Sequence, residues 1–516
     1  MRSQPLLGLR LVVSGFELEQ GEHRGIAVFT KNLLRALKQS GAEVWLLTEF
    51  SPDTKKIRRA KLPEAISTTI FSAQVLEHLN SNSSETLKEK LGKVKGFLSR
   101  FPLLRYLVLL QDTNLRRQWI QRIFPSQSIE ATELQMIPKR ELINSPYQRS
   151  ERLSYLAHVD GLICASNCFQ SSMSLAKKKI TKPFTIDCKN FDGFISTSPL
   201  NVLPHHCSIF VQTVHDLIPL QYQRTLDDLP CFTRRLISAS RARRWFVSKD
   251  AEQNYNAAIL STKLNHFEPL CSVVTQPPSL QFPGDALDWE SRTNQLQVPC
   301  LSKQQTHHFR PLSYFLFNSS VAPHKNLLFA LKAYMESSVE RLGIQFCITG
   351  QPQKDDYSKE VKAIADNNPN IVFTGYVNEA TKRQLYLNAL AIVSPSLIEG
   401  FGIPVLDAAC LGMTAIASPL GSHQEIHSMH DFNQHVLLCS TLETSDWASA
   451  IRLSCHKQQQ ELKGQSERMQ QLKLNQKRHE RILRYRHYQT LIEQAFQDSI
   501  CTLIMQNSLK KTNVTT

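Results

Sequence analysis

The sequence lacks most signals that would place a protein in or across a membrane. Its 516 residues contain no run of about twenty apolar residues, so no segment is long enough to span a bilayer as a helix. The start, Met1 to Val13, is too short for a signal peptide and has no cleavage pattern. The 12 cysteines are scattered without paired zinc-ligand spacing. We therefore expect a cytoplasmic protein with reduced, buried thiols.

Nucleic-acid motifs are missing as well. Neither paired zinc-ligand cysteines nor an aromatic-rich ribonucleoprotein strand pattern occurs. Their absence is informative because the net charge is +15, from 60 Lys and Arg against 45 Asp and Glu. A basic surface suits nucleic acid, an anionic membrane or phosphorylated ligands. Without the motifs, we exclude nucleic acid as a partner and favour a membrane surface or a phosphate-bearing ligand.

The order of apolar and glycine-rich segments predicts an α/β protein with two domains. A strand at Leu9–Val13 leads through a glycine loop into a helix with apolar residues at helical spacing, and Val44–Leu47 is a second strand. The three-glycine Rossmann fingerprint is absent. A second unit of this kind opens at Tyr314–Phe317. Residues 276 to about 310 are rich in Pro, Gln and Ser, which is typical of a linker.

The most informative stretch is Ser394–Gly412. A short strand ends in Ser-Pro-Ser, and Glu399 then precedes a Gly-Phe-Gly loop and an apolar run that suits a helix. Such a loop lets backbone N–H groups and a helix N-terminus approach a phosphate. Asp407 lies about two turns along the helix, so the two carboxylates can reach different parts of one ligand. The alternative is a tight strand–helix turn with two solvated acids.

This stretch resembles the donor-sugar motif of glycosyltransferase family 4 (group 1), whose members are retaining enzymes of the GT-B fold, with two Rossmann-like domains facing across a cleft. The resemblance implies that Glu399 holds hydroxyls of the donor sugar and that Asp407 holds the ribose. The family usually has Glu in the second position, so Asp407 has a shorter reach. The loop residues to which the resemblance assigns donor binding are Gly400, Phe401, Gly402 and Ile403.

Three further motifs are family-like. Thr-Val-His-Asp-Leu-Ile-Pro follows the strand Ser208–Thr213, and the resemblance implies that His215 faces the donor sugar and phosphate. Gly25 and Ile26 correspond to the family's first loop, where acceptor and donor phosphates meet. Lys325, in a Lys-Asn pair before a helix, corresponds to the phosphate-binding lysine that stabilises the leaving diphosphate. Each has a structural alternative: a core histidine, an ordinary loop glycine and a solvated lysine.

The resemblance implies a hexosyltransferase that uses a nucleotide diphosphate sugar and a glycan or lipid-linked hydroxyl acceptor in polysaccharide biosynthesis. A preference for mannose rests on similarity to bacterial surface-polysaccharide mannosyltransferases. No Asp-x-Asp motif occurs, so neither a metal nor a cofactor is expected. Many members carry an Arg where this chain has Ser320. That departure and Asp407 support an alternative, a catalytically degenerate nucleotide-binding or scaffold protein. An epimerase on the same fold matches the motifs less well.

The resemblance leaves residues 51–155 unplaced, as an insertion in an N-terminal acceptor-side domain spanning 1–300. Within it, 87–124 mixes basic and apolar residues, with Pro102 between two expected helices. It predicts either helices on an anionic membrane or helices that pack on the domain. A nucleotide-sugar domain is expected at 310–475, followed by a C-terminal helix within 476–516 that crosses back and ends in a frayed tail.

Overall fold

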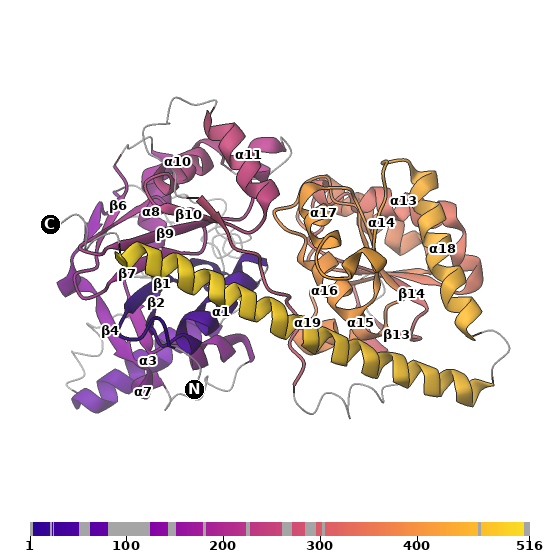
Figure 1. The fold of residues 1–516 in the computed structure, drawn as a ribbon, viewed down its shortest axis with the longest axis horizontal. Coiled ribbons are helices and arrows are strands. Elements are labelled where there is room, and N and C mark those ends of the chain that lie inside the picture. The colour runs from indigo at the N-terminus through magenta and orange to yellow at the C-terminus, as the bar shows by residue number, and fades with distance from the viewer. Residues whose placement is uncertain are drawn as a thin grey trace, which may run out of the picture.

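The computed structural model describes residues 4–20, 23, 25–50, 62–80, 124–142, 151–178, 182–222, 228–260, 271–283, 296–301, 305–462 and 466–509. They form two α/β domains that lie side by side, joined along one side by a long C-terminal helix (Figure 1). Each domain is built around a twisted, mainly parallel sheet with helices on its faces. The predicted fold, two Rossmann-like domains, is confirmed.

The N-terminal domain contains an eight-stranded sheet in the order β11-β10-β9-β7-β1-β2-β5-β4, in which only β4 runs antiparallel to its neighbour β5. A small parallel sheet of β3, β6 and β8 lies beside it. The strands are β1 (Arg10–Ser14), β2 (Glu43–Thr48), β3 (Ser128–Ile129), β4 (Gln135–Pro138), β5 (Gly161–Cys164), β6 (Phe184–Asp187), β7 (Gly193–Ser196), β8 (Val202–His205), β9 (Ile209–Val214), β10 (Arg243–Phe246) and β11 (Cys271–Val273).

Helices of this domain follow the strands as the sequence pattern indicates. The first, α1, begins at Gly25 and buries the face that carries Phe29, Leu33 and Leu37. The helices are α1 (Gly25–Gln39), α3 (Glu64–Asn80), α7 (Lys139–Leu142), α8 (Cys168–Lys177), α9 (Ile218–Gln221), α10 (Leu229–Ala239) and α11 (Lys249–Leu260), with short 3-10 turns η1 (Phe16–Leu18), η2 (Ala131–Glu133) and η4 (Glu151–His158).

The C-terminal domain has a six-stranded parallel sheet in the order β16-β15-β14-β17-β18-β19. Its strands are β14 (Tyr314–Asn318), β15 (Gln345–Thr349), β16 (Ile371–Gly375), β17 (Ala391–Ser394), β18 (Thr414–Ala417) and β19 (Val436–Leu438). Its helical elements are η6 (Pro323–Lys325), α13 (Leu327–Ser337), η7 (Val339–Leu342), α14 (Asp356–Asn367), α15 (Glu379–Asn388), α16 (Ile403–Leu411), α17 (Gly421–His427), η8 (Phe432–Gln434) and α18 (Thr444–Leu462).

Part of the segment expected to be a linker is folded. The strands β12 (Leu296–Cys300) and β13 (Gln305–Phe309) form an antiparallel hairpin. The hairpin joins the C-terminal domain, since the Leu301 N–H donates to the Phe373 carbonyl and the Phe309 ring packs on Tyr314. The composition of 276–310 therefore misled the prediction for its second half, because alternating buried residues along β12 anchor the hairpin.

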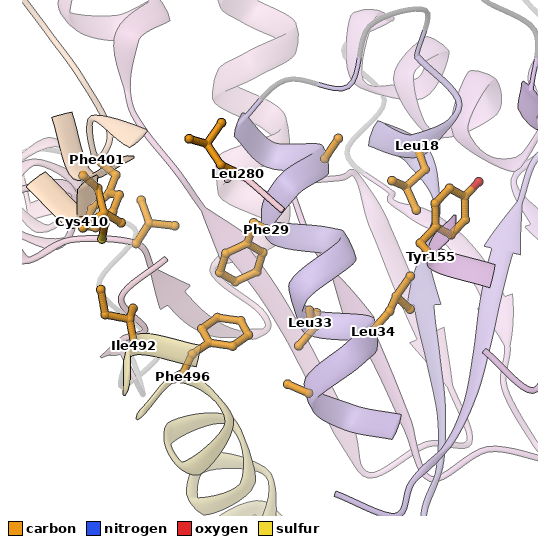
Figure 2. Packing of buried hydrophobic residues seen from close by; sticks show 14 of the residues in the cluster. Leu18, Phe29, Leu33, Leu34, Tyr155, Leu280, Phe401, Cys410, Ile492 and Phe496 are labelled. Carbon is orange, nitrogen blue, oxygen red and sulfur yellow. The ribbon is translucent and has the colours of Figure 1, made fainter. Parts of the chain in front are cut away.

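The C-terminal helix α19 (Glu467–Leu509) contacts both domains. Its first half is fixed to the C-terminal domain, where Arg481 donates to the carbonyls of Leu387 and Ala389 at 2.7 and 2.9 Å. Its second half packs on α1, with the Phe496 ring edge-on to Phe29 at 5.5 Å (Figure 2). A helix crossing back at 484–496 was expected from the sequence, and the helix begins earlier than that segment.

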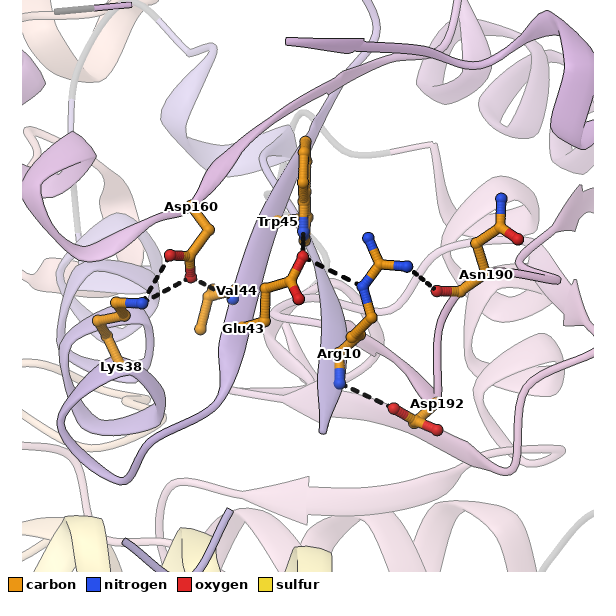
Figure 3. Close-up of polar contacts among 8 residues, drawn as sticks. All are labelled: Arg10, Lys38, Glu43, Val44, Trp45, Asp160, Asn190 and Asp192. Atoms are coloured by element: carbon orange, nitrogen blue, oxygen red, sulfur yellow. Dashed lines mark hydrogen bonds and ion pairs between the residues drawn. The ribbon is translucent and has the colours of Figure 1, made fainter. Parts of the chain in front are cut away.

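Charged side chains hold together the amino ends of neighbouring strands in the N-terminal sheet. Glu43 accepts from Arg10 and from the Trp45 indole at 3.1 and 2.7 Å. Asp160 accepts from Lys38 and from the backbone of β2 (Figure 3). These contacts join the beginnings of β1, β2 and β5. The carboxyl end of β1, at the other end of the sheet, lies at the cleft between the domains.

Most of the unplaced segment 51–155 lies outside the described residues. This includes 87–123, so the predicted membrane helices and Pro102 lie there too. Among its described parts, α3 packs on α7 and η4, and η4 packs on α1, while β3 and β4 pair with β6 and β5. Among the residues that the structure describes, no helix is long and apolar enough to cross a membrane.

Candidate active site

A cleft of about 1250 Å³ lies between the two domains. Its N-terminal wall is formed at the carboxyl ends of β1, β7 and β9 and at the start of α1. Its C-terminal wall is formed by η6, the loop after β15, the start of α15 and the glycine loop before α16. All but one of the sequence-predicted site residues line it. They are Gly25, Ile26, His215, Lys325, Glu399, Gly400, Phe401, Gly402 and Ile403.

Lys325 and Glu399 form an ion pair in this cleft. The distance between Nζ and Oε2 is 2.7 Å, and the side chains are 13% and 11% exposed. Burial alone would raise the pKa of Glu399, but the Lys325 charge and the Ser396 hydroxyl hold that pKa below 4.5. The backbone fixes this arrangement, because the Leu397 N–H donates to the His324 carbonyl at 2.8 Å. The pair places a cation and an anion beside the glycine loop.

The glycine loop is in close contact with the N-terminal domain. Gly402 has a φ of 100° and precedes α16, so the helix N-terminus opens towards the cleft. A Cβ at Gly400 would overlap the backbone carbonyl of His215. The Ser248 hydroxyl donates to the Gly400 carbonyl at 2.6 Å. These contacts explain why both positions are glycine and show the cleft in a closed arrangement.

His215 follows β9 and is 7% exposed. Its Nε2 lies 2.9 Å from the Thr197 carbonyl, which can only accept, so Nε2 carries the proton and Nδ1 is the acceptor nitrogen of the ring. The Phe29 ring packs edge-on against the imidazole at 5.0 Å. Burial lowers the pKa of His215 to about 4. The imidazole is therefore neutral at pH 7 and suits a hydroxyl of a ligand better than a phosphate charge.

Two helix N-termini meet at the cleft. Gly25 and Ile26 begin the 15-residue helix α1, and Gly402 precedes α16. A Cβ at Gly25 would lie 3.2 Å from the Ile403 side chain, so the two helix starts are in contact. The Gln276 side chain holds the Gly25 carbonyl at 2.9 Å. Unpaired N–H groups and helix dipoles at this point favour an anion such as a diphosphate.

Asp407 is the exception among the predicted site residues. It is fully buried in α16 and is not part of the cleft lining. Its carboxylate accepts from the Ser279 N–H at 2.7 Å, from the Ser279 hydroxyl, and from the Tyr485 hydroxyl at 2.7 Å. Burial raises the pKa of Asp407. In this arrangement Asp407 links its own helix, α16, to the segment after β11 and to α19.

Several cleft residues have no distinctive sequence motif. Glu17, Ser198 and Arg235 lie on the N-terminal wall, and Glu379 and Lys382 form an ion pair at 2.7 Å on the other. His423 is buried beneath Gly402, with Nδ1 bonded to the Ser418 carbonyl at 2.9 Å. Glu17 could have been noticed, since it follows the first predicted strand as His215 follows another. The others lie on helices or loops whose spatial position depends on the whole fold.

The C-terminal domain carries the sequence pattern of a known family. Residues 302–476 match the model of the glycosyl transferases group 1. This match includes the Lys325–Glu399 pair and the glycine loop, so the family resemblance is confirmed for the domain that contains them. The match to the glycosyl transferases group 1 thus covers the C-terminal domain, about a third of the chain.

Two curated relatives extend this similarity. The chain is 31% identical over 111 residues to an uncharacterized glycosyltransferase of Methanocaldococcus jannaschii, and 29% identical over 129 residues to O-antigen chain mannosyltransferase B of Escherichia coli. These matches cover 22% and 25% of this chain. They span only 28% and 34% of the relatives' lengths.

A solved structure supports the fold of the whole chain. Sucrose-phosphate synthase from Thermosynechococcus elongatus superposes with a TM-score of 0.50 over 98% of this chain and 100% of that chain, at 12% identity. At this identity the likeness concerns the fold alone. Both halves of this chain therefore share the GT-B architecture, including the half that the family model does not match.

Proposed function

We propose that the protein is a glycosyltransferase that moves a hexose from a nucleotide diphosphate sugar to a hydroxyl of a glycan or lipid-linked acceptor. One observation carries the proposal: the buried Lys325–Glu399 pair lies beside a glycine loop, in a cleft where two helix N-termini meet. A sugar diphosphate combines hydroxyls with a strong anion, and this site offers a partner for each. The names of both curated relatives are consistent with the same activity.

Each group has a role in this proposal. Glu399 is ionised and accepts from donor-sugar hydroxyls. Lys325 stabilises negative charge on the diphosphate as the bond from the sugar to the phosphate breaks, helped by N–H groups at the starts of α1 and α16. Neutral His215 accepts from a donor hydroxyl through Nδ1. The configuration at the sugar carbon is retained, with the diphosphate and the acceptor on the same face.

The electrostatics favour stabilisation by protein cations and dipoles. Lys325 and two helix N-termini act at one place, and we propose that transfer needs neither a metal nor a cofactor. The preference for mannose rests only on similarity to the Escherichia coli mannosyltransferase. A peripheral position at the inner face of the membrane is proposed only from the basic segment 87–124, most of which lies outside the described residues.

The experiment is a transfer assay with labelled UDP-, GDP- and ADP-hexoses, run with and without EDTA. Release of the hexose to water or to an added acceptor is expected from one nucleotide series, with equal rates in EDTA. Glu399→Gln should lower the rate, because a hydrogen bond to a charged group contributes about 1.5–3 kcal/mol. Turnover that is absent for every donor would contradict the proposal.

A scaffold protein is the second candidate. Ser320 stands where the family resemblance leads us to expect Arg, and the Asp407 carboxylate is bonded to Ser279 and Tyr485. These two observations favour weakened donor binding. Nucleotide binding without turnover would favour this candidate over the enzyme.

A further inference from the structure

Two cysteines, Cys188 and Cys207, lie close together at the edge of the small sheet in the N-terminal domain. Cys188 directly follows β6, and Cys207 comes two residues after β8. These strands pair in parallel, with Asp187 opposite His205, so both chains leave the sheet at the same edge. A side-chain hydrogen bond joins the two thiols. Because Cys207 Sγ donates to the Ile209 carbonyl at 3.7 Å, its sulfur accepts from the Cys188 thiol.

The backbone holds the two segments that carry these thiols beside each other. At one end, the Cys188 N–H donates to the His205 carbonyl at 2.9 Å. At the other end, the N–H groups of Ser208 and Ile209 both donate to the Asp192 carbonyl at 3.0 Å. Two cysteines can be bridged without backbone movement only when their side chains point towards each other, and the hydrogen bond between the thiols shows that these do.

The two thiols differ in how easily a reagent can reach them. Cys188 is 1% exposed, whereas Cys207 is partly exposed. The hydrogen bond with Cys207 and burial raise the pKa of the Cys188 thiol. Cys188 therefore stays protonated, and Cys207 is the sulfur that a reagent in solution meets first.

Other cysteines show what is particular to this pair. Cys271 is also partly exposed, but its thiol is bonded to Arg244. Cys300 and Cys347 are close enough for the charge of one to act on the other, but both are buried. The pair that follows β6 and β8 combines contact between two thiols with access from solution, which are the two conditions for thiol–disulfide exchange.

We propose that Cys188 and Cys207 are a redox-sensitive pair that forms an intramolecular disulfide by exchange with a small disulfide such as oxidised glutathione. All 12 cysteines lie within the described residues and none forms a disulfide, so this structure shows the reduced form. The inference concerns a modification of the N-terminal domain and is independent of the proposed transferase function.

The exchange has two steps. The Cys207 sulfur loses its proton and attacks one sulfur of oxidised glutathione, and one glutathione leaves as a thiolate that takes up a proton. The Cys188 sulfur then loses its proton and attacks the Cys207 sulfur of this mixed disulfide, and the second glutathione leaves in the same way. The two protein thiols lose two electrons and two protons, and the two glutathione molecules gain them.

The disulfide closes a loop that includes part of the cleft wall. Between the two cysteines lie β7 and Thr197, whose carbonyl accepts from the His215 imidazole at 2.9 Å. The pair itself lies shortly before the first residues of β7 and β9, which are neighbours in the large sheet. A cross-link between segments that are adjacent in the native fold restricts the unfolded chain more than the folded one. Oxidation should therefore raise the unfolding temperature.

The test is equilibration of the folded protein in glutathione buffers of increasing oxidised to reduced ratio. The samples are quenched in acid, denatured and alkylated, and the thiols that remain are counted by intact mass. The wild type should lose two thiols, and dithiothreitol should restore them. Lys189 lies between the two cysteines, so trypsin leaves them on separate peptides that only the disulfide joins.

Two serine variants provide the matched comparison. Cys207→Ser should keep all its thiols, whereas Cys271→Ser, which removes another partly exposed thiol, should lose two as the wild type does. The oxidised wild type should unfold at a higher temperature than the reduced wild type, and Cys207→Ser should unfold at the same temperature in both buffers. Circular dichroism checks that each variant is folded.

Three results would overturn the inference. The first is a wild type that keeps all its thiols in the most oxidising buffer. The second is a glutathione adduct at Cys207 that persists without a cross-link to Cys188. The third is a bridge between Cys300 and Cys347 at the same glutathione ratio, since burial should protect that pair. An equal rise in unfolding temperature in Cys207→Ser would also count against it, because the buffer and not the bridge would then be the cause.

Discussion

The ion pair between Lys325 and Glu399 yields the sharpest energetic prediction. Removing one member of a buried pair leaves the other charge without its partner, which costs about 3–5 kcal/mol. Both side chains are slightly exposed here, at 13% and 11%. We therefore expect Glu399→Gln to lower the free energy of unfolding by about 3 kcal/mol, the lower end of that range. Lys325→Met should cost a similar amount. The double variant should lose much less than the sum, since no unpaired charge remains.

The assay is equilibrium unfolding in urea, with transfer measured on the same samples. The pH dependence has a definite sign. The pKa of Glu399 is held below 4.5 in the folded protein, so the ion pair stabilises the fold above pH 4.5. This contribution to the free energy of unfolding is lost as the pH falls through the pKa of Glu399 in the folded protein. The difference in the free energy of unfolding between wild type and Glu399→Gln should therefore become smaller at acid pH. Additive effects of the two single changes, or a difference that grows in acid, would refute the reasoning.

Three other changes follow from the site. Gly400→Ala should lower transfer severely with little change in the stability of each domain, because a Cβ overlaps the His215 carbonyl when the cleft is closed. The kinetic comparison is with Gly343→Ala, where a φ of 73° strains the backbone but the added methyl group meets no other atom, so transfer should be retained. Asp407→Asn should cost about 1–3 kcal/mol by weakening its buried bonds to Ser279 and Tyr485, measured as a lower unfolding midpoint; an unchanged midpoint would contradict the interdomain role. Burial raises the pKa of Glu49 well above 4.5, so the folded state binds a proton that the unfolded state releases, and the free energy of unfolding should fall as the pH rises above 4.5. Glu49→Gln should flatten this dependence of the free energy of unfolding on pH. The same pH dependence in wild type and Glu49→Gln would contradict this prediction.

Much of the fold could be predicted because it depends on local patterns. The strands at β1, β2, β9 and β14 are short apolar runs followed by glycine or polar turns, and their order gives parallel sheets. The hairpin at 296–309 was missed because its alternation is short and surrounded by Pro, Gln and Ser. Its contacts with Phe373 and Tyr314 show which domain it joins.

The donor side of the candidate site could be located for a similar reason. Lys325, Glu399 and the glycine loop lie next to elements with strong sequence patterns, and the structure brings them together. Asp407 shows the limit of this approach. Spacing along a helix predicts which face a residue lies on, but the partners Ser279 and Tyr485 come from segments 128 and 78 residues away. Glu17 and Ser198 were missed because tertiary packing alone makes them neighbours.

The most direct test of the central claim is thermal unfolding of the wild type and Glu399→Ala with UDP, GDP, ADP and their hexose conjugates, without added metal. A ligand at about a hundred times its dissociation constant adds about 2.7 kcal/mol to stability. We predict that one nucleotide raises the unfolding temperature of both proteins, and that its hexose conjugate raises it further only in the wild type. No shift with any nucleotide, or equal further shifts in both proteins, would contradict a nucleotide-sugar site at Glu399.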